Sequence, residues 1–197
     1  VKSGRIVFQG KDVANLPTRK LQEAGFAHIP ADRKAQGLVP DYSVAQNLVL
    51  SDIHSSTFSH WGFIRHRSVS RHAEQMIQEY DIRPPLPKQQ VKHLSGGNQQ
   101  KVIIAREFDK APHFLVAVNP IRGVDICATE FIHHKLMEQK QAGTSILLIS
   151  TDLEEIMDIS DRIAVIFHGK IVGIVDPRTT SREEIGLMMT GIAKQEG

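Results

Sequence analysis

The chain has 197 residues, enough for one ordinary domain with an inserted subdomain. Its 24 Lys and Arg and 22 Asp and Glu give a net charge of +2, too small to indicate nucleic-acid binding through bulk charge. The one cysteine, Cys127, excludes an intrachain disulfide and is typical of a reducing compartment, and no apolar run approaches the ~18 residues of a membrane span. The opening VKSGRIVFQG has no signal-peptide pattern and resembles the middle of a domain, so we expect a chain cut from a longer protein.

The first 43 residues predict short elements. The β-rich run at residues 4–10 lies between glycines and predicts a strand with a turn. Pro17 and Gly25 bound a short helix, because proline is favoured at a helix start and glycine just after its end. Residues 26–30 predict a strand that ends at Pro30, and residues 32–43 predict a loop rich in turn formers.

The next segment is mainly helical. Residues 44–80 have helical spacing that is interrupted near SSTFSHWGF. The basic run RHRSVSRH at 65–72 predicts a solvated helix face, and contact with an acidic partner is the alternative. Three prolines exclude a long helix from residues 81–93.

The second half predicts a parallel α/β sheet covered on both faces, because short apolar strands alternate with helices. We expect a helix over 97–109, the strand HFLVAV, a helix over 126–141, the strand SILLIS, a helix in TDLEEIMDIS and two strands around residues 168–169. Ser181 and Glu184 predict a capping box before a last helix. The expected organisation is an α/β core in residues 1–40 and 101–175, a helical subdomain in 41–100 and a helical tail in 176–197.

Residues 93–108, HLSGGNQQKVIIAREF, place a serine and two glycines at the start of a helix. Free N–H groups and the positive end of the helix dipole attract an anion there, which predicts a phosphate site. The run LSGGNQQK resembles the signature motif of ATP-binding-cassette ATPases, and its N-Q-Q-K wording is similar to the branch that imports sugars and nucleosides. IPADRKAQGLVPDYS, DIRPP and FLVAVNPIRGVD extend the resemblance along almost the whole chain.

This resemblance implies a P-loop NTPase-type fold with the helical subdomain typical of the family. The chain contains no G-x-x-x-x-G-K-[ST], so the resemblance implies a core that is incomplete at its N-terminus and lacks its Walker A region. Importers of this branch usually carry two cassettes in one chain, the second with weakened catalytic residues. The sequence resembles that second, degenerate cassette.

The catalytic positions that the resemblance identifies are occupied by inert residues. Val118 lies where the family has its magnesium-binding aspartate, and Asn119 lies where it has its catalytic glutamate. Valine cannot bind a metal, and asparagine cannot accept a proton at neutral pH. Ala31 replaces the Q-loop glutamine, and Thr151 replaces the switch histidine. We therefore expect no catalytic residue and no metal ligand in this chain, and an isolated chain without ATPase activity.

Thr151 has a structural interpretation as well. A threonine followed three residues later by Glu154 is typical of a helix N-cap with a capping box.

Six residues are candidates for contact with a nucleotide held by a partner cassette. By resemblance, the Ser95 hydroxyl and two glycine amides point at a γ-phosphate, Asn98 reaches toward the ribose, and Asp125 lies at the dimer interface. The alternatives are that Ser95 and Asp125 are only helix N-caps and that the glycines only form a turn. The set is Ser95, Gly96, Gly97, Asn98, Gln99 and Asp125.

The expected cofactors are ATP and Mg²⁺, bound mainly by the partner. The expected partners are the first cassette of the same protein, membrane permease subunits that contact residues 32–50, and indirectly a substrate-binding protein. Nucleic acid is not expected, and the expected place is the cytoplasmic face of the plasma membrane. A structural or regulatory cassette domain and a nonmembrane cassette protein stay open as alternatives. The sequence leaves sugar and nucleoside open, with DIRPP and IPADR favouring nucleoside.

Overall fold

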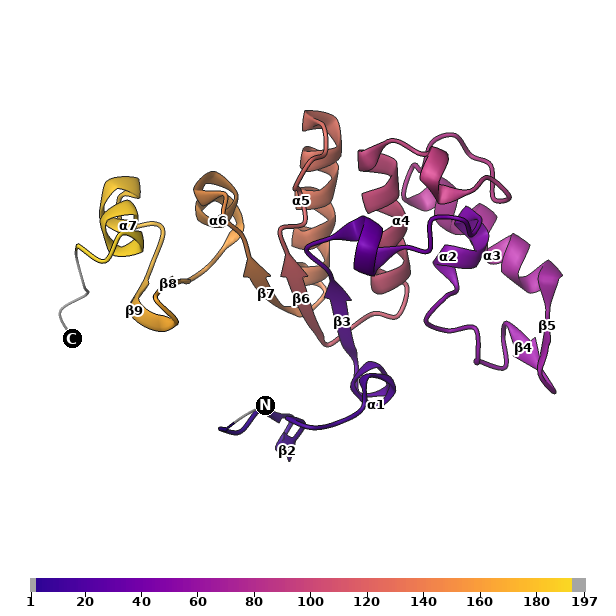
Figure 1. Cartoon of the computed structure of the whole chain (residues 1–197), viewed down its shortest axis with the longest axis horizontal. Coiled ribbons are helices and arrows are strands. Elements are labelled where there is room, and N and C mark those ends of the chain that lie inside the picture. Colours follow the sequence, from indigo (N-terminus) through magenta and orange to yellow (C-terminus); the bar gives the residue numbers. More distant parts are fainter. Residues whose placement is uncertain (1–2, 193–197) are drawn as a thin grey trace. The chain divides into compact units, whose positions relative to one another are not determined.

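The computed structural model describes residues 3–192 of the chain (Figure 1). The described residues fall into two compact units, with the boundary between Leu147 and Leu148. Throughout residues 3–192, no helix has the length and apolar character needed to cross a membrane.

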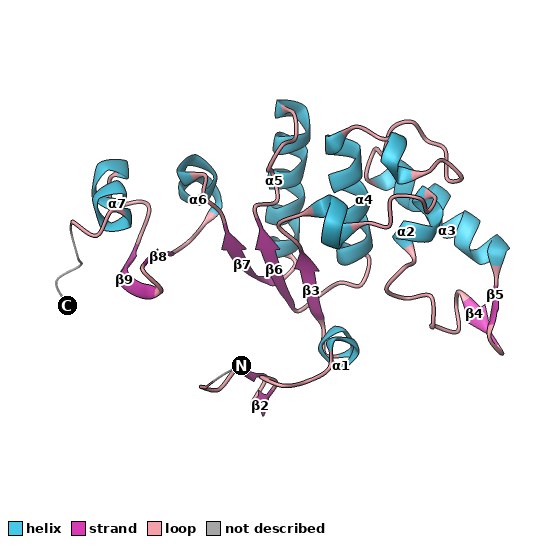
Figure 2. Cartoon of the chain, viewed as in Figure 1, coloured by secondary structure: helices cyan, strands magenta, loops and turns pink. Residues whose placement is uncertain are grey.

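A three-stranded sheet has the order β3-β6-β7, and its third strand crosses the boundary between the units (Figure 2). The strands are β3 (Phe26–Ile29), β6 (Phe114–Val118) and β7 (Ser145–Ile149), all at predicted positions. Strands β3 and β6 are parallel, with Phe26 opposite Phe114. The sheet therefore joins two segments separated by about half of the chain, and Ile29, Leu115 and Ala117 are fully buried in it.

Helix α4 (Gly96–Phe108) contacts both β3 and the segment that follows β3. Arg106 and Glu107 form a buried ion pair with Nε and Oε1 2.8 Å apart. The Arg106 guanidinium donates to the Gly37 carbonyl at 2.9 Å, and the His28 N–H donates to Glu107 Oε2 at 3.4 Å. Buried charges are tolerated when they are paired and hydrogen-bonded in this way. These bonds fix the helix against the sheet.

The segment predicted as a loop over residues 32–43 contains a short π-helix, η1 (Arg33–Gly37). Asp32 begins it by accepting hydrogen bonds from the N–H groups of Lys34 and Ala35. These two backbone bonds hold the pKa of the Asp32 carboxyl below its usual range. The predicted loop over residues 32–43 therefore contains one helical turn that the turn-forming residues do not reveal.

The helical part of this unit contains α2 (Val44–Leu48), α3 (His66–Glu79) and the 3-10 turn η2 (Val91–His93). Helix α2 packs against α3 and α4. The interruption predicted near SSTFSHWGF is a β-hairpin of β4 (Ser59–His60) and β5 (Phe63–Ile64). These two strands are not among the predicted elements. The prediction that residues 81–93 contain no long helix is confirmed.

The remaining elements of the first unit also follow the predicted order. A small antiparallel pair joins β1 (Val7–Phe8) to β2 (Lys11–Asp12), and α1 (Thr18–Glu23) follows Pro17 as its N-cap. Helix α5 (Ile126–Gln141) has the predicted bounds and contacts α4.

The second unit contains α6 (Leu153–Ile159), the antiparallel strands β8 (Ile163–Phe167) and β9 (Lys170–Val175), and α7 (Arg182–Met189). Its apolar core is formed by Ile163, Val165, Val175, Ile185 and Met188. The predicted N-cap at Thr151 is wrong. Asp152 is the N-cap of α6, because its carboxylate accepts from the Glu154 and Glu155 N–H groups at 3.0 and 3.2 Å.

The predicted capping box at the start of α7 is confirmed, and it allows a test. The Ser181 hydroxyl accepts from Glu184 N at 3.2 Å, and Ser181 N donates to Glu184 Oε2 at 2.8 Å. Ser181→Ala should destabilise α7 by about 1 kcal/mol, because a helix N–H loses its partner. Hydrogen exchange of the α7 amides should become several-fold faster. Ser70→Ala, at an exposed position in α3, is the control and should leave α7 unchanged.

Candidate functional site

Ser95 lies at the N-terminus of α4 with its side chain exposed. Its backbone is extended, with φ −61° and ψ 159°, and its hydroxyl accepts from the Asn98 N–H at 3.4 Å and from Asn98 Nδ2 at 2.9 Å. Ser95 is thus the N-cap of a 13-residue helix. The same position presents the first-turn N–H groups at the surface, where a helix attracts anions.

Gly96 and Gly97 permit a close approach within this chain. A Cβ atom at Gly97 would lie 2.8 Å from Ala128 Cβ and 2.9 Å from Asp125 Oδ2. A Cβ atom at Gly96 would lie 2.6 Å from an Arg33 guanidinium nitrogen. Gly97 therefore requires glycine for internal packing, whereas a side chain at Gly96 would first displace the end of Arg33. This reason for glycine is separate from the predicted approach of a phosphate.

Asp125 is the N-cap of α5, and its Oδ1 accepts from the Ala128 N–H at 2.9 Å. Its second carboxylate oxygen lies against Gly97. The structure therefore brings Ser95, Gly97 and Asp125 together, although the first and last are 30 residues apart in sequence. The capping interpretation of Asp125 is confirmed, and its role toward a second cassette stays a prediction.

Arg33 joins this site to the segment after β3. Its guanidinium donates from Nη1 to the Arg122 carbonyl at 2.6 Å and from Nη2 to the Gly123 carbonyl at 3.0 Å. The same nitrogen, Nη2, lies against Gly96. Arginine is suited to this position because its planar fork can reach two acceptors at once. The residues Arg33, 95–97 and 122–125 are called the signature cluster below.

Arg33 is not among the six predicted site residues. The sequence IPADRK predicts only a loop leading into the helical part. The available signal was an arginine directly after the aspartate that begins a turn. That pattern does not reveal a partner 89 residues further along the chain.

Asn98 and Gln99 support the loop around Ser95. Asn98 Oδ1 accepts from the Arg83 N–H at 2.7 Å. The Gln99 side chain is buried and its amide donates to the Val91 and Leu94 carbonyls at 3.1 and 3.3 Å. Both side chains therefore hold neighbouring backbone in this structure. Their contacts with a nucleotide stay predictions.

Strand β6 ends at Val118, and the next residue is Asn119 with a left-handed φ of 47°. The Asn119 carbonyl accepts from the Arg122 N–H at 3.1 Å, which begins the turn into the signature cluster. Residues 118 and 119 thus offer no carboxylate at this strand end. Among residues 3–192, no group of three or more His, Cys, Asp or Glu side chains is arranged to hold a metal ion.

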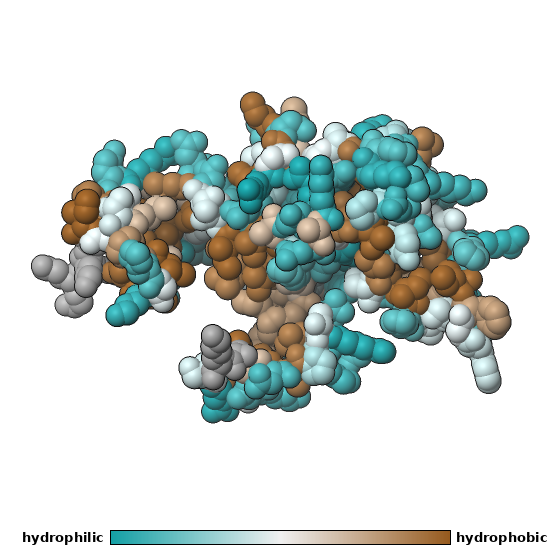
Figure 3. Space-filling view, viewed as in Figure 1, coloured by the Kyte–Doolittle hydropathy of each residue, from teal (hydrophilic) through white to brown (hydrophobic). Residues whose placement is uncertain are grey.

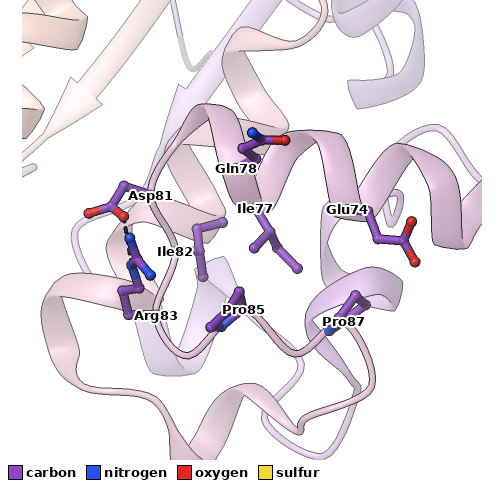
Figure 4. Close-up of a pocket in the computed structure, with 8 residues that line it drawn as sticks. All are labelled: Glu74, Ile77, Gln78, Asp81, Ile82, Arg83, Pro85 and Pro87. Carbon is purple, nitrogen blue, oxygen red and sulfur yellow. Dashed lines mark hydrogen bonds and ion pairs between the residues drawn. The ribbon is translucent and has the colours of Figure 1, made fainter.

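A separate pocket lies in the helical part (Figure 4). It has a volume of about 310 Å³, and Asp81 and Arg83 form an ion pair across 2.7 Å at one side of it. The Arg83 guanidinium holds the pKa of the Asp81 carboxyl below its usual range. None of the six predicted site residues lines this pocket, whose lining residues are Glu74, Ile77, Gln78, Asp81, Ile82, Arg83, Pro85 and Pro87.

The chain is similar in sequence to ATP-binding proteins of nucleoside and ribose importers. The chain is 45% identical over 194 residues to the guanosine import ATP-binding protein NupO of Bacillus subtilis, covering 98% of this chain and 38% of that protein. It is 42% identical to the nucleoside import ATP-binding protein NupA of Lactococcus lactis, covering 97% of this chain and 38% of that protein. A ribose import ATP-binding protein, RbsA of Oceanobacillus iheyensis, is 37% identical, and the match covers 97% of this chain and 38% of that protein. The chain thus spans 38% of the length of these relatives.

Solved structures give the same fold. The ATP-binding cassette MJ0796, in a dimeric post-hydrolysis state with ADP and Pi, matches with a TM-score of 0.73 at 18% identity, over 90% of this chain and 75% of that one. The ADP form of the cassette MJ1267 matches with a TM-score of 0.69 at 23% identity, and the match covers 95% of this chain and 73% of that one. The family model described as ABC transporter matches residues 1–122, which is more than half of the chain. The chain, with its serine and two glycines at the start of α4, therefore belongs to the ABC transporter family.

Proposed function

We propose that this chain is the second, catalytically degenerate cassette of an importer that takes up a nucleoside or a simple sugar. Its signature cluster would complete an ATP site whose phosphate-binding loop and Mg²⁺ belong to a partner cassette. The observation that carries this proposal is the exposed Ser95 at the N-terminus of α4, directly before two glycines that lie against Arg33 and Asp125.

The end of β6 supports the proposal that this chain is a catalytically degenerate cassette. Val118 and Asn119 occupy a strand end that, by resemblance, carries an aspartate and a glutamate in active cassettes. An amide can orient a water molecule, and it cannot take up its proton at neutral pH. This chain would therefore contribute to hydrolysis at the partner's site and not at its own.

The relatives favour a nucleoside over a sugar as the imported substrate. The guanosine and nucleoside import proteins are 45% and 42% identical to this chain, whereas a glucose import protein of Haloferax volcanii and the ribose import protein of Oceanobacillus iheyensis are each 37% identical. We infer partners of the same kind: a first cassette, permease subunits at the cytoplasmic face of the membrane, and a substrate-binding protein. Uptake of labelled guanosine against ribose by the assembled transporter tests this preference.

Ser95→Asp separates the proposed role in ATP turnover from the capping role. Aspartate is as good an N-cap as serine, so the stability of α4 should be unchanged. Its negative charge would repel a phosphate at the same position, so ATP turnover of the complete transporter should fall at least about tenfold, equivalent to about 1.4 kcal/mol. The measurement is phosphate release by the reconstituted transporter.

Ser95→Asn is the matched control, because asparagine caps equally well and carries no charge. It should keep much more turnover than Ser95→Asp at equal folding stability. Equal turnover in the aspartate variant and the wild type would contradict the proposal and favour a purely structural cassette.

A further inference from the structure

We propose that the β4–β5 hairpin is a membrane-contact element that binds the surface of an anionic lipid bilayer. Three apolar side chains form its tip: Trp61 is 88% exposed, Phe63 is 79% exposed and Ile64 is 48% exposed. Figure 3 shows hydrophobic surface at the end of the first unit where Figure 1 places this hairpin. Exposed aromatic side chains of this size are unusual on a surface that contacts only water.

The turn of the hairpin places the tryptophan in an unusual backbone conformation. Ser59 pairs with Ile64 and His60 with Phe63, so the turn consists of two residues. Its residues Trp61 and Gly62 both have positive φ, 52° and 83°. Such turns favour Asn-Gly, and a bulky residue with positive φ is strained. Inside the fold the Trp61 ring meets the neighbouring His60 ring edge-on, with centroids 6.1 Å apart, and the side chain is otherwise exposed. A strained position that leaves most of a tryptophan exposed supports a role outside the fold.

The base of the hairpin is anchored, so the tip is held at a fixed place. Phe58 is buried and its ring lies 5.1 Å from the His72 ring on α3. The Arg65 N–H donates to the Phe58 carbonyl at 2.8 Å, and its guanidinium donates to the Ser56 carbonyl at 3.1 Å. The base of the hairpin is thus bonded across its two ends and packed against α3.

The positive charge in the segment around the tip favours an anionic partner. Residues 54–72 contain Arg65, Arg67 and Arg71 and no Asp or Glu, a charge of +3 with neutral histidines. The whole chain carries +2, so the other residues together carry −1. All three arginines are exposed. Positive charge is therefore concentrated in the segment that contains the apolar tip and the first turns of α3.

The exposed apolar tip and the neighbouring arginines together fit a bilayer surface. Tryptophan is enriched at membrane–water interfaces, and adjacent basic residues attract anionic headgroups. A specific protein interface usually involves about 20–30 residues on each side, whereas the tip offers three apolar side chains. A few inserted side chains and a basic surround suffice for weak membrane contact that adds to a larger assembly.

Trp61 is the only tryptophan in the chain, so its fluorescence reports on the tip directly. The 197-residue chain is titrated with phosphatidylcholine vesicles that contain phosphatidylglycerol, and with vesicles of phosphatidylcholine alone. With the anionic vesicles, the emission of Trp61 should shift to the blue and its quenching by acrylamide should decrease. Both changes should weaken as salt is added, because salt screens the arginines.

Variants separate insertion from charge attraction. Phe63→Ser with Ile64→Ser should lower the partition coefficient for anionic vesicles at least about fivefold, because apolar area is lost from the interface. Arg67→Ser with Arg71→Ser should lower it on anionic vesicles and remove the difference between the two lipid mixtures. Ile171→Ser is the matched control, at a residue 61% exposed on β9, and should leave partitioning unchanged.

Two results would overturn the proposal. One is unchanged Trp61 emission with anionic vesicles, including the case in which the emission shifts only when detergent-solubilised permease subunits are added. The other is an equal loss of vesicle binding in Ile171→Ser and in the Phe63→Ser, Ile64→Ser variant, since that would show binding without a specific site.

Discussion

Gly97→Ala is expected to lower the stability of the first unit by about 1–3 kcal/mol, the usual effect of overpacking. The added methyl would lie 2.8 Å from Ala128 Cβ and 2.9 Å from Asp125 Oδ2, so α4 and α5 would have to separate. The neighbours cannot yield easily, because Asp125 is fixed as the N-cap of α5 and Ala128 is buried in the helix. Urea denaturation followed by circular dichroism should show a lower transition midpoint.

Gly186→Ala is the matched control for this substitution. Gly186 also lies within a helix, α7, and a Cβ atom there would meet nothing within 4 Å. Alanine is a better helix former than glycine by about 1 kcal/mol, so this variant should be as stable as the wild type or more stable. Equal stability of Gly97→Ala and the wild type would show that α4 and α5 are not in close contact at Gly97.

The sequence predicted most elements of the fold because their signals are local. Proline before α1, the serine caps of α4 and α7, and the aspartate cap of α5 each specify a helix start through one or two hydrogen bonds. Strands β3 and β6 are apolar runs between turn formers, and both lie at predicted positions.

The misses have physical reasons. The hairpin at 59–64 has tryptophan where turn signals call for asparagine, so its first turn residue gave no hint of a turn. Thr151 and Asp152 are adjacent and both suit an N-cap, and composition alone cannot choose between neighbours. In the structure Asp152 is the N-cap, because its carboxylate accepts from two N–H groups.

The six predicted site residues show the same difference between local signals, which the sequence reveals, and packing, which it does not. Their position at helix starts followed from sequence, and it is confirmed for Ser95 and Asp125. Their mutual contact depended on how α4, α5 and η1 pack, which no local pattern encodes. Arg33 is the clearest case, because its role arises only when residues 33 and 122–123 meet.

Arg33→Met should loosen the 122–125 turn while it keeps the apolar stem of the side chain. Two charge-assisted hydrogen bonds to the Arg122 and Gly123 carbonyls would be lost. Each such bond contributes about 1.5–3 kcal/mol when it is buried. Because Arg33 is only partly buried, we expect the two bonds together to contribute roughly 1–2 kcal/mol. The Val124 N–H, which donates to the Ile121 carbonyl at 3.3 Å, should exchange with solvent about tenfold faster.

Arg33→Lys tests whether the fork or the charge is responsible. A lysine ammonium is a point charge and cannot span two carbonyls with the same geometry, so this variant should exchange at an intermediate rate. Arg19→Met, which removes an exposed arginine paired with Glu23 on α1, should leave the exchange of the turn unchanged. If Arg33→Met exchanges like the wild type, the turn is held by its own backbone bonds. If lysine restores full protection, charge alone is sufficient. The combination of fast exchange with methionine and incomplete rescue by lysine would establish Arg33 as the residue that fixes the 122–125 turn against the start of α4.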